Sequence, residues 1–223
     1  MLNQFKKILV IGAHPDDETL GLGGTINACA KNKSKINCLI FTDGELARRK
    51  NTRIQQRKNQ SMNAAKVLGI NKIDFLGFVD QKLDIIPVVD LSKKIETAIE
   101  KFNPDTIFTH FWGDVNQDHR RVFEATNIAT RAVPDSKIKN IICYETPSSS
   151  EWGIETFRPN FFVDISKSLS SKIKAFKKYT YEVRKFPHPR SEQAIKDRAS
   201  FWGSTSGMKS SEAFMIYRIR TIN

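Results

Sequence analysis

With 223 residues, 39% of them hydrophobic and 27% charged, the chain has the size and composition of a soluble globular protein with one sizeable core. Its formal net charge is +12, and no apolar run approaches the roughly 18 residues of a membrane span, which argues against a transmembrane protein. The apolar run after Lys6 and Lys7 is too short for a signal peptide, and Cys29, Cys38 and Cys143 are too scattered for a disulfide framework, so we expect a cytoplasmic protein.

Short apolar strands alternate with helical patterns over residues 1–147. Strands are expected at residues 8–11, 36–41, 73–76, 106–109 and 141–144, and helices at residues 18–30, 53–68, 89–102 and 119–130. Gly69 and Pro104 stand where the second and third helices should stop. This alternation predicts a Rossmann-like α/β fold, in which a mostly parallel sheet carries helices on both faces.

The pattern loosens over residues 148–223. Here we expect a strand at residues 161–165, a basic helix at 169–179, a second helix at 192–202 and a last strand at 214–219. We interpret this part as an extension of the Rossmann-like core formed by residues 1–147. The whole chain, residues 1–223, is therefore expected to be a single domain.

Positive charge is concentrated in this C-terminal part of the chain. Residues 166–223 contain 13 Lys and Arg against 4 Asp and Glu, which gives +9 of the total +12. The bias predicts either a surface that attracts an anionic substrate, such as a sugar nucleotide, or nucleic acid, or else only a solvated lysine-rich face. Aromatic residues do not interleave with basic ones as in single-strand binding surfaces, so nucleic acid is the less favoured partner.

Polar side chains follow every predicted strand of the core. Because ligands gather at the carboxyl ends of the strands in such sheets, these side chains should share one edge. They are His14, Asp16 and Asp17 after the first strand, Thr42, Asp43 and Glu45 after the second, Asp80 after the third, residues 110–119 after the fourth, and Glu145 and Thr146 after the fifth.

Three of these residues suggest a metal site. His14 and Asp17 stand three positions apart on a tight turn, and Asp118-His119, at the start of the fourth helix, is the obvious source of a third ligand. Catalytic zinc commonly has three protein ligands from His and Asp or Glu and leaves one position to water. His14, Asp17 and His119 therefore predict a His₂Asp site that suits Zn²⁺, with Fe²⁺, Co²⁺ or Mn²⁺ as alternatives.

Asp16 is the candidate general base. Its side chain and that of Asp17 should point in different directions, so Asp16 cannot easily bind the same ion but can accept a proton from water beside it. The alternative is that Asp16 and Asp17 only cap the helix that follows. His110 also has two interpretations, as a catalytic group or as a hydrogen-bonded residue that ends a strand.

The chain resembles the LmbE-like, or PIG-L, zinc N-deacetylases along nearly its whole length. The first and last motifs are the most specific, and His188-Pro189-Arg190-Ser191 is similar to a branch that acts on sugars and glycan precursors. The similar segments are residues 13–18 with 20–24, residues 42–45, Arg57 with residues 64–69, Asp80, residues 114–119, residues 188–191, Gly207 and residues 211–214.

This resemblance implies hydrolysis of the N-acetyl group of an N-acetylglucosamine-type sugar, with release of acetate, as in polysaccharide biosynthesis. It gives the zinc-ligand roles to His14, Asp17 and His119 and the role of base to Asp16. It also implies that Arg57 and Asp80 hold substrate hydroxyl or phosphate groups, for which a guanidinium group is well suited.

Two positions depart from the family pattern. Asn116 and Gln60 stand where many members have a histidine and a glutamate. Asn116 can bind substrate through a hydrogen bond but cannot protonate the leaving amine, so Asp16 would return the proton. His188, held between two prolines, or His110 would stabilise the oxyanion. His188 could serve its own site or that of a neighbour in a homo-oligomer, or form only a structural corner.

Two other functions fit part of the sequence. The basic charge would suit a metal-dependent phosphoesterase that acts on an anionic substrate. A Rossmann-like module that binds nucleotide or nucleic acid without catalysis is the other alternative, and it would need no transition metal. The first strand is not followed by Gly-x-Gly-x-x-Gly, which argues against a dinucleotide site.

Overall fold

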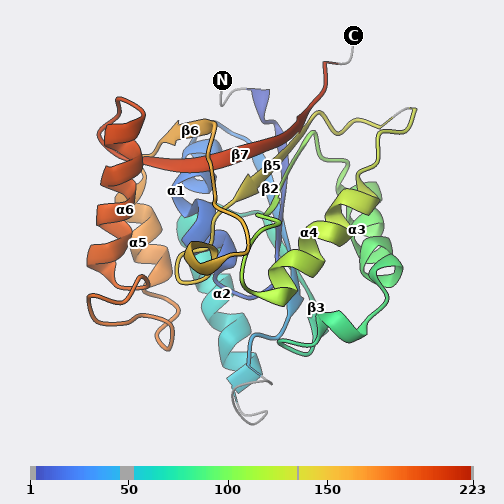
Figure 1. Cartoon of the computed structure of the whole chain (residues 1–223), viewed down its shortest axis with the longest axis horizontal. Coiled ribbons are helices and arrows are strands. Elements are labelled where there is room, and N and C mark those ends of the chain that lie inside the picture. Colours follow the sequence, from blue (N-terminus) through green and yellow to red (C-terminus); the bar gives the residue numbers. More distant parts are fainter. Residues whose placement is uncertain (1–3, 46–52, 135, 222–223) are drawn as a thin grey trace.

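A seven-stranded sheet organises the protein (Figure 1) in the computed structural model, which describes residues 4–45, 53–134 and 136–221. The strand order is β3-β2-β1-β4-β5-β7-β6. Strands β1 to β5 are parallel to one another, while β7 runs antiparallel to both β5 and β6. The strands are β1 (Lys7–Gly12), β2 (Lys35–Thr42), β3 (Lys72–Phe78), β4 (Thr106–His110), β5 (Asn140–Tyr144), β6 (Phe161–Asp164) and β7 (Ser211–Ile219).

Helices cover both faces of this sheet, with α1, α2, α5 and α6 on one side and α3 and α4 on the other (Figure 1). The predicted α/β fold with a mostly parallel sheet is thus confirmed. Within the described residues, no helix is both long and apolar enough to cross a bilayer. The helices are α1 (Asp17–Lys31), α2 (Ile54–Leu68), α3 (Val88–Phe102), α4 (Gln117–Ala129), α5 (Leu169–Phe176) and α6 (Glu192–Thr205), with short 3₁₀ helices η3 (Leu83–Ile85) and η4 (Ser150–Trp152).

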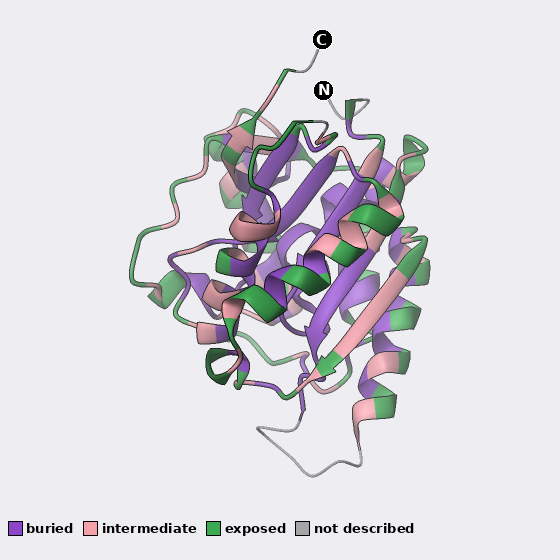
Figure 2. Ribbon diagram, turned by 90° about the vertical axis from the view of Figure 1, so that its right-hand side faces the viewer, coloured by how far each residue is buried: buried purple, intermediate pink, exposed green. Residues whose placement is uncertain are grey.

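The core is divided between the two faces by the alternation of side chains along each strand. In β1, Ile8 and Val10 pack in the cluster under α1 and α2, whereas Leu9 and Ile11 pack in the cluster under α3 and α4. Figure 2 shows that the central strands are buried, while the edge strand β3 is only partly covered. Central strands buried on both faces explain why their sequences are continuous apolar runs.

Several helix ends differ from the sequence prediction, such as that of α6 at Thr205, and two of the differences have identifiable reasons. Helix α4 begins at Gln117 because Asn116 Oδ1 accepts a hydrogen bond from the Asp118 N–H at 2.9 Å and caps the helix. Helix α5 ends at Phe176, three residues before the predicted end. Tyr179 lies in the turn that follows and is buried, and its hydroxyl donates to Glu18 Oε1 at 2.5 Å.

Helix α1 is interrupted in a way that the sequence did not predict. Leu22 has a non-helical φ of −143°. Glu212 of β7 caps the second part of the helix, because its carboxylate accepts hydrogen bonds from the N–H groups of Gly24 and Thr25 at 2.9 and 2.6 Å. Lys172 Nζ lies 2.5 Å from the same carboxylate. The C-terminal part of the chain therefore fixes the shape of the helix that follows β1.

Candidate metal centre

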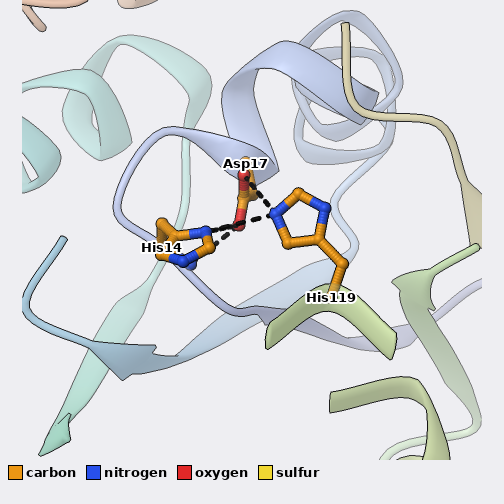
Figure 3. A group of neighbouring side chains, drawn as sticks. All are labelled: His14, Asp17 and His119. Carbon is orange, nitrogen blue, oxygen red and sulfur yellow. Dashed lines mark hydrogen bonds and ion pairs between the residues drawn. The ribbon is translucent and has the colours of Figure 1, made fainter. Parts of the chain in front are cut away.

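Three side chains from separate elements meet at the carboxyl edge of the sheet (Figure 3). His14 follows β1, Asp17 begins α1 and His119 lies in the first turn of α4. His14 Nδ1 is 3.1 Å from His119 Nε2 and 3.4 Å from Asp17 Oδ2. His119 Nε2 is 3.5 Å from Asp17 Oδ1. All three side chains are buried, and His14 is the most exposed of them at 8%.

These separations fit a tetrahedral metal site. Ligand atoms at about 2.0–2.1 Å from a tetrahedral zinc ion are about 3.3 Å from one another. The 3.1 Å between His14 Nδ1 and His119 Nε2 and the 3.5 Å between His119 Nε2 and Asp17 Oδ1 lie close to that value, and the other oxygen of the same carboxylate is 3.4 Å from His14 Nδ1. Among the residues that the structure describes, none donates a hydrogen bond to Asp17 Oδ1, although this atom is buried. The group formed by His14, Asp17 and His119 can therefore hold a divalent metal ion.

Carboxylates orient both histidines from the side away from this group. His14 Nε2 lies 3.1 Å from Asp80 Oδ1 and 3.1 Å from Asp118 Oδ2. His119 Nδ1 lies 3.2 Å from Asp114 Oδ2. Contacts of this kind fix which ring nitrogen faces a metal and make that nitrogen a better ligand. The structure thus directs Nδ1 of His14 and Nε2 of His119 toward the same point.

The protonation of the two histidines is coupled to metal binding. Burial lowers the pKa of His14, but hydrogen bonds with the surrounding carboxylates outweigh it and hold the pKa well above the usual range. The pKa of His119 is also raised, because the charges of Asp17 and Asp114 outweigh the effect of burial. A metal ion must therefore displace the protons that the raised pKa values keep on this histidine pair before it can bind.

Asp16 points away from its neighbour Asp17. Its φ of 126° is strained for a residue with a side chain. Asp16 Oδ2 accepts hydrogen bonds from Arg57 Nη2 at 3.0 Å and from Arg190 Nη1 at 3.1 Å. Burial raises the pKa of Asp16, while the charges of Arg190 and Arg57 act in the opposite direction without cancelling it. A carboxyl group with a raised pKa next to a metal-binding group is suited to act as a general base.

Glu182 links the two arginines that contact Asp16. Its carboxylate lies 3.0 Å from Arg57 Nη1 and 2.6 Å from Arg190 Nη1. Arg57 belongs to α2, whereas Glu182 and Arg190 belong to the segment between α5 and α6. Opposite charges therefore alternate around Asp16, and the segment of residues 177–191 supplies two of the charged groups.

His110 lies at the end of β4, directly behind His119. The two rings are stacked, with centroids 3.9 Å apart and planes 11° apart. His110 Nε2 accepts a hydrogen bond from the Ala13 N–H at 2.9 Å, and Nδ1 lies 3.3 Å from Thr146 Oγ1. Burial lowers the pKa of His110 to about 4. A neutral ring with both nitrogens engaged inside the protein supports His119, while the predicted catalytic role of His110 stays a prediction.

The part of the sequence that supplies these site residues matches a known family. Residues 9–130, which include His14, Asp16, Asp17 and His119, match the family PIG-L, described as GlcNAc-PI de-N-acetylase. This match covers more than half of the chain. The chain belongs to the PIG-L family. The resemblance expected from the sequence motifs is thereby confirmed.

Relatives of this PIG-L chain include proteins named as deacetylases. The uncharacterized deacetylase YaiS of Escherichia coli strain K12 is 31% identical over 183 residues, 79% of this chain and 92% of that protein. The diacetylchitobiose deacetylase of Thermococcus kodakarensis is 26% identical over 94% of this chain and 82% of its own length. The solved N,N'-diacetylchitobiose deacetylase of Pyrococcus horikoshii has a TM-score of 0.79 at 24% identity, covers 97% of this chain and 85% of its own, and shows the shared fold.

The predicted substrate-binding residues of this PIG-L chain all make contacts within the protein, and two of them, Arg57 and Asp80, are buried. Asp80 is 1% exposed and lies behind His14. Arg57 is 3% exposed and pairs with Asp16 and Glu182. The third, Asn116, uses its side-chain oxygen to cap α4. These contacts give the three residues orienting roles, and their contact with substrate stays a prediction.

His188 is placed differently from the other predicted site residues. It lies on an exposed loop, and its Nδ1 accepts a hydrogen bond from the backbone N–H of Arg190 at 3.0 Å. Burial and the charges of Arg190 and Arg184 lower the pKa of His188. Arg190, rather than His188, is the residue of the His-Pro-Arg-Ser motif that contacts Asp16. The oxyanion role assigned to His188 stays a prediction.

Sequence reasoning assigned no role to three residues next to Asp16. Arg190 belongs to the His-Pro-Arg-Ser motif, so the motif could have indicated a role for it. Glu182 stands in no recognisable pattern. Glu18 follows the two aspartates, and its carboxylate accepts hydrogen bonds from the Asp16 N–H at 3.1 Å and from the Tyr179 hydroxyl. Burial raises the pKa of Glu18 to about 7.

Proposed function

We propose that the protein is a zinc-dependent deacetylase that hydrolyses the N-acetyl group of an N-acetylated amino sugar. The observation that carries the proposal is the convergence of His14 Nδ1, His119 Nε2 and the Asp17 carboxylate within 3.1 to 3.5 Å of one another, with Asp16 alongside. Two nitrogens and a carboxylate suit Zn²⁺ among the common divalent metals. The three cysteines are free and buried, which suits an enzyme of the reducing cytoplasm.

Zinc bound by His14, Asp17 and His119 would supply a Lewis acid for the amide carbonyl and would make a water molecule more acidic. The residues of the chain account for the movement of protons. Asp16 takes a proton as the water oxygen forms a bond to the carbonyl carbon. When the carbon–nitrogen bond breaks, Asp16 returns the proton to the amine nitrogen, and acetate leaves. Asp16 thus serves in turn as base and acid. It takes over the proton transfer for which many family members have a histidine at the position of Asn116.

The substrate class rests on the named relatives. Two relatives have names that describe substrates with N-acetylglucosamine units. They are diacetylchitobiose deacetylase and the probable N-acetyl-α-D-glucosaminyl L-malate deacetylase 2 of Bacillus subtilis. The latter is 32% identical over 53% of this chain. Both names describe an amide on a sugar carbon, so an N-acetylglucosamine unit is the substrate that we propose. The basic charge of residues 166–223 favours a substrate that also carries a phosphate or carboxylate.

Metal analysis followed by acetate release tests this proposal. Purified protein should contain about one zinc ion per chain and release acetate from at least one of a panel of free, nucleotide-linked and lipid-linked N-acetylglucosamine compounds. Activity should disappear with a chelator and return with Zn²⁺. His119→Ala should lose both metal and activity.

The same panel separates deacetylation from the phosphoesterase alternative. From an N-acetylhexosamine phosphate, a deacetylase releases acetate and leaves the phosphate ester, whereas a phosphoesterase releases phosphate and leaves the amide. Release of phosphate without acetate would overturn the proposed function. Protein that neither binds a transition metal nor releases acetate would support a binding module instead.

A further inference from the structure

Three consecutive serines, Ser148 to Ser150, contact both the residues behind His119 and the residues around Asp16. They follow β5, and Ser149 and Ser150 are buried while Ser148 is partly exposed. Ser149 and Ser150 N–H groups both donate to the carbonyl oxygen of Thr146, at 3.1 and 3.0 Å. Glu151 accepts hydrogen bonds from the N–H groups of Ser148 and Ser149 at 3.2 and 3.0 Å. The backbone of this serine loop is therefore well fixed.

Two of the hydroxyl groups hold Asp114. The Ser149 hydroxyl donates to Asp114 Oδ1, and the Ser150 hydroxyl donates to Asp114 Oδ2 at 2.6 Å. The Asn116 N–H also donates to Oδ1, at 2.8 Å. Asp114 in turn lies 3.2 Å from His119 Nδ1. The serine loop thus determines where the carboxylate behind His119 can lie.

The hydroxyl group of Ser148 faces the residues around Asp16. Arg190 Nε donates to Ser148 Oγ at 2.7 Å, and Arg190 Nη1 donates to Asp16 Oδ2 at 3.1 Å. One guanidinium group therefore spans from the serine loop to Asp16. Since Ser148 has a φ of 72°, the backbone turns at this residue and its side chain follows a different direction from that of Ser149.

We propose that the serine loop positions the site from two sides: Ser149 and Ser150 hold Asp114 against His119, and Ser148 holds Arg190 against Asp16. The proposal rests on the metal-dependent deacetylase function proposed above. It assigns separate effects to neighbouring residues. Loss of the Ser149 hydroxyl should weaken metal binding, whereas loss of the Ser148 hydroxyl should slow the reaction and leave metal binding as it was.

Single substitutions distinguish these effects. Removal of a group that orients a metal ligand commonly costs about 10- to 100-fold in metal affinity, so Ser149→Ala should raise the Kd for Zn²⁺ by about that factor. Ser148→Ala should change the Kd for Zn²⁺ by less than about twofold and lower kcat of the zinc-saturated protein by about tenfold. The Kd is measured with Zn²⁺ alone, by competition with a chromogenic chelator, and needs no substrate.

Matched variants guard against a general effect on folding. Ser149→Thr keeps the hydroxyl group and should restore most of the affinity, while Ser204→Ala, on the exposed side of α6, should change neither Kd nor kcat. Thermal unfolding of each metal-free variant reports on stability. Ser150→Ala gives a second test of the Asp114 contact, although its hydroxyl also accepts from the Thr146 N–H at 2.8 Å.

The outcomes separate this inference from the proposed function. If wild-type protein binds no zinc, the proposed function fails first. If wild type binds zinc and releases acetate but Ser149→Ala binds zinc with unchanged affinity, the serine loop does not position His119 and the inference is overturned. Equal losses of metal affinity in Ser148→Ala and Ser149→Ala would also overturn it, because a loosened loop would then explain both.

Discussion

Asp16 combines a strained backbone with a buried, doubly contacted carboxylate. Arg57 and Arg190 both donate to Asp16 Oδ2. The φ of 126° directs the Asp16 side chain away from that of Asp17, the first residue of α1. Asp16→Asn keeps this shape but cannot accept a proton, so kcat should fall by about 10²- to 10⁴-fold. Zinc content should stay at the wild-type level because Asp16 Oδ2 contacts Arg57 and Arg190 and is not one of the three proposed ligands. Steady-state kinetics and elemental analysis of the same preparation measure both quantities.

A matched substitution makes this prediction specific to Asp16. Asp197→Asn, on the exposed side of α6, removes the same charge from a side chain whose hydrogen bond is with Gln193, and it should leave kcat unchanged. Loss of zinc from the Asp16→Asn protein would instead make Asp16 part of the metal site. Wild-type activity in that variant would remove it from the reaction.

His14 and His119 should make metal binding strongly dependent on pH. Carboxylates hold the pKa of both rings above the usual value of about 6.5, so the metal-free pair keeps its protons to a higher pH than free imidazole does. Zinc must displace these protons, and its affinity should rise with pH until the rings are neutral. In metal-free protein the sign is opposite, because stability from the charged rings is complete below about pH 6.5 and is lost as pH rises through the raised pKa values.

Calorimetry tests this dependence directly. Zinc titrations at one pH in buffers of different ionisation enthalpy give the number of protons released per ion bound. We expect net release of protons near pH 7 and a fall in the number released at higher pH. Release of no protons near pH 7 would show that the rings are already neutral, against the carboxylate contacts described above.

At the scale of elements, the interrupted helix α1 depends on a buried ion pair. Glu212 is 4% exposed and caps the second part of the helix, while Lys172 neutralises its charge. Glu212→Ala leaves a buried lysine without its partner and two helix N–H groups without an acceptor, so the free energy of unfolding should fall by about 3–5 kcal/mol. Urea unfolding measures the change. Glu100→Ala, on the exposed side of α3, should leave the midpoint unchanged.

The double variant Glu212→Leu with Lys172→Met tests whether the missing partner causes the loss. Replacing both members of a buried pair by apolar residues is often neutral or stabilising, so the double variant should be more stable than Glu212→Ala. A double variant as unstable as the single one would show that the helix cap, rather than the unpaired charge, dominates.

Most elements could be predicted from the sequence because their signals are local. The apolar run of residues 8–11 predicts a central strand, and Gly69 marks the end of α2, where it adopts a φ of 85°. The break at Leu22 was not predicted, and the carboxylate that accepts the N–H groups just after it comes from β7, almost two hundred positions away. Glycine at position 21 has a similar explanation, since a Cβ there would lie 2.3 Å from a ring carbon of Tyr144.

At the scale of the whole molecule, the same distinction applies to the site. Parallel strands bring the ends of β1 and β4 together, so His14, Asp17 and His119 could be paired from strand order and residue type alone. The contacts of Asp16 with Arg190 and Glu182 depend on how residues 177–191 return to the sheet edge, for which the sequence carries no periodic signal. Tertiary contacts of this kind lie beyond local patterns.

Charge acts over the whole molecule and should affect the choice of substrate. The net charge of +12 is concentrated in residues 166–223, which also supply Arg190 next to Asp16. An anionic N-acetylhexosamine phosphate should therefore be used with a higher kcat/KM than the neutral sugar at low salt. Because the Debye length shrinks to about 8 Å at 0.15 M salt, this advantage should decline as sodium chloride is added.

The neutral sugar is the control for that salt dependence. Its kcat/KM should hardly change between about 0.02 and 0.3 M sodium chloride, since only long-range attraction is screened over this range. A decline confined to the anionic substrate places the effect on substrate capture rather than on stability or on the proposed metal site. Equal declines for both substrates would assign the salt effect to the protein itself, and the basic C-terminal part would then be only a solvated face, the alternative that composition left open.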